Sequence, residues 1–249
     1  MESTWSIGTC TALIVLILQT GGVQLFRDQE GWIGAYKARN AYWLHDGNPN
    51  RPHAELTSGN HSNGFFNSRL VIPDDSLMSQ AASDLLDRLE LDPMGYVEKT
   101  QTFVGPQTGA TKLAELLRDC AQLNDRITRE WASPAKDEVD GQKAMVFQED
   151  DRKKLLGKQI ILCEDVITTG GTTELMADEV RKAGGLILPV ILTLVNRSGQ
   201  HKIGGKLIVA LIHQTMPIWA PDECPLCAQG SEAIRPKGEN WARLNANYE

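Results

Sequence analysis

One stretch, residues 158–185, constrains the fold more than any other part of this 249-residue chain. Its apolar residues 160–162 predict a short buried strand of a parallel sheet. An acidic pair, Glu164 and Asp165, comes next, followed by a turn of threonines and glycines over 168–173. A helical pattern then runs to the Gly-Gly that closes the stretch. The order strand, turn, helix predicts an α/β fold.

The turn over 168–173, called the Thr-Gly turn below, has the composition of a phosphate-binding site. Glycine lets backbone N–H groups approach a ligand closely, and the following helix presents its positive N-terminus to an anion. The carboxylates just before the turn would repel a phosphate, but they suit sugar hydroxyls or a metal-bound diphosphate. The stretch is neither a Walker A loop nor a G-x-G-x-x-G motif. It predicts a ligand such as a ribose 5-phosphate.

Composition narrows the class of protein. A net charge of −7 argues against nonspecific nucleic-acid binding, which needs a basic surface. The five cysteines are an odd number in a mid-sized chain, so we expect no disulfide framework and a cytoplasmic location. The apolar run 10–18 is too short to span a membrane and lacks a basic segment before it, which predicts a buried N-terminal helix over 1–25.

The C-x-x-C pair Cys224 and Cys227 supplies half of a zinc site. His213 and Cys163 are poor partners because both are predicted on strands. We therefore expect a structural turn here and no metal site.

The run I-I-L-C-E-D-V-I-T-T-G-G-T over 160–172 resembles the signature of type I phosphoribosyltransferases. That resemblance implies that the Thr-Gly turn binds the 5-phosphate of phosphoribosyl pyrophosphate (PRPP) and that the acidic pair contacts the ribose hydroxyls. It also implies Mg²⁺ carried by PRPP, and a catalytic role for Asp165. The residues so implied are Glu164, Asp165, Thr168, Thr169, Gly170, Gly171 and Thr172.

A second segment, 58–69, resembles the N-terminal element of the orotate phosphoribosyltransferases, through Ser58, Gly59, Ser62, Phe65, Phe66, Asn67 and Arg69. The resemblance implies that Phe65 and Phe66 flank a flat pyrimidine. It further implies that Arg197, after the predicted strand 186–195, reaches the substrate carboxylate.

Two further loops complete the resemblance. Gly105 and Gly109 lie in a first loop, residues 105–110, that opens a helix and is expected to bind pyrophosphate through its backbone. The lysine common in this loop is Thr108 here, and Lys112 is a possible replacement.

Residues 132–143 are charged and predict a mobile loop, in which Lys136 falls at the catalytic lysine. The usual Arg-Lys pair is absent and Glu138 replaces a histidine, so Arg129, Lys143 and Arg152 stay open as substitutes.

We therefore expect a single α/β domain with a mostly parallel sheet flanked by helices. Within it, 1–70 form an N-terminal helix and small hood, 71–215 the core, and 216–249 a C-terminal tail. The expected reaction converts orotate and PRPP into orotidine 5′-phosphate and pyrophosphate, and the enzyme is expected to be a homodimer. A phosphoribosyltransferase for another base and a noncatalytic PRPP-binding regulator are the alternatives.

Overall fold

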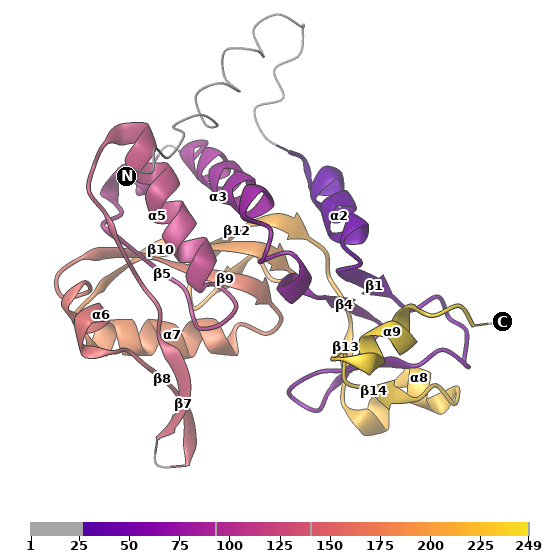
Figure 1. The fold of residues 1–249 in the computed structure, drawn as a ribbon. Coiled ribbons are helices and arrows are strands. Elements are labelled where there is room, and N and C mark those ends of the chain that lie inside the picture. The colour runs from indigo at the N-terminus through magenta and orange to yellow at the C-terminus, as the bar shows by residue number, and fades with distance from the viewer. Residues whose placement is uncertain (1–26, 93, 140, 249) are drawn as a thin grey trace, which may run out of the picture.

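The computed structural model describes residues 27–92, 94–139 and 141–248, so the helix predicted over 1–25 lies outside the described residues. Its core is a six-stranded sheet with the order β11-β12-β10-β9-β5-β6 (Figure 1). The strands are β5 Thr102–Val104, β6 Glu130–Ala132, β9 Gln159–Ile167, β10 Leu186–Asn196, β11 Lys202–Ile203 and β12 Lys206–His213. All pair in parallel except β11, which is antiparallel at one edge. The predicted mostly parallel sheet is confirmed.

Helices cover both faces of this sheet, because its central strands are apolar on both sides. Ile161 and Cys163 of β9 pack into a core with α2 (Gln29–Ala38), α3 (Asp75–Glu90) and α5 (Thr111–Asp125). Ile160 and Leu162 point the other way and pack against α7 (Gly171–Lys182). Two short helices, α4 (Tyr96–Lys99) and α6 (Glu149–Lys153), lie in the connections.

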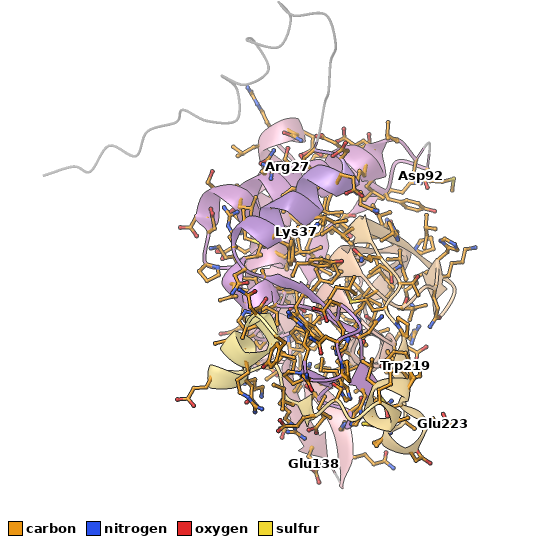
Figure 2. All side chains as sticks on the ribbon, turned by 90° about the vertical axis from the view of Figure 1, so that its right-hand side faces the viewer. Arg27, Lys37, Asp92, Glu138, Trp219 and Glu223 are labelled. Atoms are coloured by element: carbon orange, nitrogen blue, oxygen red, sulfur yellow. The ribbon has the colours of Figure 1, made fainter. Side chains whose placement is uncertain are left out.

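The hood is built from both ends of the described chain. It contains a two-stranded ladder, β1-β4, and a four-stranded sheet of order β13-β3-β2-β14 (Figure 1). The strands are β1 Tyr42–Leu44, β2 His53–Glu55, β3 His61–Ser62, β4 Gly64–Phe66, β13 Ile218–Trp219 and β14 Ala233–Ile234, with helices α8 Pro225–Ala228 and α9 Glu239–Asn245. Figure 2 has the hood toward the viewer, with Trp219 and Glu223 on it.

The segment 216–249, predicted as a C-terminal tail, is an integral part of the hood over its described residues. Trp241 and Leu244 are buried in a small core with Trp43, Ala54 and Ile234. The Trp43 Nε1–H group donates to the carbonyl of Leu244 at 2.8 Å. The hood therefore depends on the C-terminal residues.

Two other local expectations, for residues 27–55 and 125–131, are also corrected. The aromatic residues of 27–55 do not form a surface excursion, because Trp32 and Tyr36 of α2 are buried in the core. The strand expected over 125–131 is confined to β6, since α5 continues to Asp125 and Ile127 is exposed.

Residues 135–143, expected within a mobile loop, belong to an antiparallel hairpin of β7 (Ala135–Val139) and β8 (Gln142–Val146). The hairpin projects from the body in Figure 1, and Glu138 lies on it in Figure 2. The irregularity predicted at Pro189 is confirmed by a register shift between Ile187 and Ile191.

None of the helices in the described part of the chain has the length and hydropathy of a membrane span.

The packing of the hood predicts a large loss of stability for Trp241→Ala. This side chain contacts Phe65 edge-on and donates its Nε1–H group to the carbonyl of Asn40. Removing it should lower the free energy of unfolding by about 3 kcal/mol, measured by urea denaturation. Trp219→Ala, which truncates a half-buried tryptophan of the same hood, should cost clearly less. Equal losses would contradict the assigned core.

Candidate functional site

The Thr-Gly turn begins after the end of β9 at Ile167, and its last three residues form the start of α7, which begins at Gly171. Gly170 has φ of +89°, and a Cβ there would lie 2.6 Å from Ile203 Cδ1, so only glycine fits. As the N-cap it has no side chain to bond the first N–H groups of α7. The turn and its flanks, residues 164 and 166–173, line a small cavity of about 80 Å³.

The acidic pair lies beside this cavity. Glu164 is buried, and its Oε2 atom has no hydrogen-bond partner among the described residues. Burial raises the pKa of Glu164 well above its ordinary value, and the neighbouring Asp165 charge raises that pKa further. The pair thus offers an unused acceptor oxygen at the cavity wall.

The first loop reaches the acidic pair directly. A Cβ on Gly109 would lie 2.6 Å from Asp165 Oδ1, so glycine permits this approach. Gly105 is equally constrained, since its Cβ would lie 2.3 Å from the carbonyl oxygen of Ala110. The Ser133 hydroxyl donates to the carbonyl of Gly105 at 2.8 Å and fixes the loop to the base of the β7–β8 hairpin.

Lys136 is exposed on β7, opposite Met145 of β8. Its charge acts on Glu164, where it opposes the effect of burial on the pKa of that carboxyl. The hairpin therefore brings a cation to the acidic pair.

The other basic residues considered from the sequence have different partners. Arg129 is buried, pairs with Asp125, and donates to the carbonyls of Thr100 and Val97. Arg152 pairs with Glu179, and Lys112 with Asp75 on α3. The Lys143 side chain is exposed on β8.

Arg197 follows β10 and joins the core to the hood. Its side chain is only 1% exposed and donates from Nη1 to the Gly64 carbonyl at 3.0 Å and from Nη2 to Ser62 Oγ at 2.5 Å. Its Nε atom has no partner, and no carboxylate forms an ion pair with it within the described ranges. Desolvation lowers the pKa of Arg197 to about 10. Among the residues that the structure describes, this buried cation therefore has no counter-charge.

The two phenylalanines point to opposite sides of β4, as successive strand residues do. Phe66 is 2% exposed and packs in the core against Tyr36 and Tyr42. Phe65 is half-buried beside Trp241. The predicted base-binding role of Phe66 therefore has no support from its position.

No family model matches the chain. The orotate phosphoribosyltransferase of Carboxydothermus hydrogenoformans is 28% identical over 185 residues, covering 74% of this chain and 88% of its relative. The orotate phosphoribosyltransferase of Sulfurimonas denitrificans is 29% identical over 197 residues, covering 74% of this chain and 90% of its relative. The chain is a homologue of the orotate phosphoribosyltransferases. The recognition made from the motifs is confirmed.

Solved structures agree on the fold. The orotate phosphoribosyltransferase of Aeropyrum pernix superposes with a TM-score of 0.54 at 20% identity, over 72% of this chain and 92% of the other. The orotate phosphoribosyltransferase of Mycobacterium tuberculosis, in complex with Fe(III) dicitrate, superposes with a TM-score of 0.52 at 15% identity. The match covers 75% of this chain and 97% of the other. The fold is that of the type I phosphoribosyltransferases, and the sequence similarity supports an enzyme of the pentosyltransferase class.

Sequence reasoning missed a cluster in the hood. The expectation of no metal site rested on the C-x-x-C pair standing alone, whereas the structure brings two histidines to it. Potential ligand atoms of His53, His61, Cys224 and Cys227 all lie within 4.8 Å of one another. Two histidines eight residues apart on either side of a turn-rich stretch were the available signal.

The burial of Glu164 predicts a pH effect on stability. Above the ordinary pKa of a glutamate, about 4.3, the unfolded chain loses this proton while the folded protein keeps it, so the free energy of unfolding falls as pH rises. Glu164→Gln has no proton to lose at this position, so its free energy of unfolding lacks this fall with pH. Its stability relative to the unmodified protein should therefore grow between about pH 5 and about pH 8.

Urea unfolding at both pH values measures this difference. Glu130→Gln, which neutralises an exposed carboxylate, is the control and should show no such trend. A Glu164→Gln difference independent of pH would be the contrary result.

Proposed function

We propose that this protein is an orotate phosphoribosyltransferase, which transfers the 5-phosphoribosyl group of PRPP to a ring nitrogen of orotate. The observation that carries the choice of base is Arg197, a buried guanidinium with an unpartnered Nε atom and no ionic partner within the described residues. Orotate carries a carboxylate, which pairs with guanidinium in a charge-assisted geometry. Similarity to orotate enzymes supports the same assignment.

The site near α7 suits PRPP. The free N–H groups at the start of α7 and the adjoining small cavity suit the 5-phosphate. That cavity is far below the roughly 300–1,000 Å³ of whole-ligand pockets, so the rest of PRPP would lie outside it. The unused Oε2 atom of Glu164 is an acceptor for a ribose hydroxyl. Backbone groups of the first loop, next to Asp165, would bind the diphosphate.

The reaction breaks the bond between ribose C1 and the diphosphate oxygen, and a nitrogen of the base forms the new bond to C1. Positive charge develops on the ribose and negative charge on the leaving pyrophosphate. Lys136, close to the acidic pair, would stabilise the leaving group. Mg²⁺ arriving with PRPP would neutralise part of the diphosphate charge, and the Asp165 carboxylate is an oxygen ligand of the kind it prefers. A homodimer and a cytoplasmic location belong to the same proposal.

The role of Lys136 is tested by loss of orotate absorbance with PRPP and Mg²⁺. Lys136→Ala should lower kcat by roughly 10²-fold, because a charge aimed at the leaving group is lost. Lys143→Ala, which removes the exposed lysine of the partner strand, should stay within about threefold of the unmodified enzyme. A larger loss for Lys143→Ala than for Lys136→Ala would transfer the role to Lys143.

The role of Arg197 is tested by substrate binding. Arg197→Met should raise the KM for orotate by roughly 10–100-fold, which corresponds to one charged hydrogen bond. PRPP affinity, measured by calorimetry, should be nearly unchanged and also shows that the variant folds. An unchanged KM for orotate, or unmodified protein that uses adenine but not orotate, would overturn the choice of base.

A further inference from the structure

A compact cluster of four donor side chains lies in the hood, outside the phosphoribosyl site. His53 comes from β2, His61 from β3, and Cys224 and Cys227 bracket the first turn of α8. His53, His61 and Cys224 are buried, and Cys227 is half-buried. Neither cysteine forms a disulfide. Two imidazoles and two thiols gathered in one buried place are the donor set of a structural zinc ion.

We propose that His53, His61, Cys224 and Cys227 bind one structural zinc ion. Zinc takes nitrogen at about 2.0–2.1 Å and sulfur at about 2.3 Å in a tetrahedron, which requires about 3.3 Å between two nitrogens and about 3.6 Å between nitrogen and sulfur. The His53 Nε2 and His61 Nδ1 atoms are 3.1 Å apart. His53 Nε2 lies 3.5 Å from both sulfurs, and His61 Nδ1 lies 3.3 Å from Cys227 Sγ.

All four of these distances agree with the tetrahedral edges within about 0.3 Å. The other two separations, His61 to Cys224 and Cys224 to Cys227, lie within 4.8 Å. The four donor atoms are therefore gathered closely enough for one ion to contact them all after small side-chain adjustments.

The hydrogen bonds around His53 fix its tautomer for metal binding. Ser231 donates its hydroxyl hydrogen to the Arg51 carbonyl at 2.6 Å. The same oxygen lies 2.8 Å from His53 Nδ1, so it must accept the Nδ1–H group. His53 Nε2 is therefore unprotonated, and its lone pair faces the cluster. Orientation of a ligand histidine through its other ring nitrogen is the usual arrangement at zinc sites.

The backbone also presents the two cysteines as a ligand pair. Pro225 starts α8 directly after Cys224, and the Ala228 N–H group donates back to the Cys224 carbonyl. Gly230, with φ of +93°, donates its N–H to the carbonyl of Cys227 and closes the turn. The chain then continues into β14, which pairs with β2 beside His53. The four ligands are thus fixed by adjoining hydrogen-bonded elements.

The ion would join parts of the hood that are far apart in sequence. His53 and Cys224 are 171 residues apart. Ser62, whose hydroxyl accepts from Arg197, directly follows the ligand His61. Zinc binding would therefore stabilise the C-terminal segment on the β2–β3 hairpin and the strand that contacts Arg197.

The test uses the full chain, produced with added zinc and purified under reducing conditions without chelator. Mass spectrometry of the metal content should give about one zinc per chain. A double Cys224→Ser, Cys227→Ser variant should lose at least about tenfold of this zinc. Cys120→Ser, which changes a buried cysteine of α5, is the matched control and should keep it.

A second measurement covers the case in which the double variant fails to fold. Replacement of the metal by Co²⁺ in the unmodified protein should give visible absorption of a tetrahedral ion and a thiolate-to-cobalt charge-transfer band. A chelator should lower Tm, and zinc but not magnesium should restore it. The proposal is overturned if the unmodified protein, purified under reducing conditions, binds no zinc, or if the folded double variant keeps it.

Discussion

The buried guanidinium of Arg197 is a charged contact that joins the core to the hood. It follows β10 of the core and donates to Ser62 Oγ and the Gly64 carbonyl of the hood. A buried cation without an anion is costly, and hydrogen bonds to neutral acceptors offset only part of that cost. Burial of the Arg197 charge is therefore an unfavourable contribution to stability, located at the boundary between the core and the hood. Such positions are typical of binding sites rather than of purely structural contacts.

Sheet topology explains why the other candidate residues gather near this boundary. The strands β5, β9 and β10 are parallel, so their carboxyl ends lie at one edge of the sheet. The first loop follows β5, the Thr-Gly turn follows β9, and Arg197 follows β10. Gly109 touches Asp165 because β5 and β9 are direct neighbours. In open α/β sheets, ligands bind at this edge.

The sequence predicted those parts of the fold whose signal is local. The Thr-Gly turn, its strand and its helix lie within one short stretch, and Pro189 marked the irregularity in β10. Strand β7 was missed because its exposed charged residues hide the alternation that indicates a strand.

The hood was harder to predict from the sequence for a different reason. Its core joins Trp43 to Trp241, and its donor cluster joins His53 to Cys224, so each pair is separated by most of the chain. No periodicity within a window of a dozen residues carries that information. Arg129 illustrates the same limit, since only the structure shows that its side chain is buried and donates to the carbonyls of Thr100 and Val97.

The interleaving of the hood has a consequence for synthesis of the protein. Strands β2 and β3 are made early, yet their outer neighbours β14 and β13 come from the last part of the described chain. The sheet core, whose strands all precede residue 214, has its complete set of elements sooner. On the ribosome, β2 and β3 therefore keep unpaired outer edges until the C-terminal residues emerge. Strand β3, which carries Ser62, is therefore among the last parts of the molecule to be fully paired.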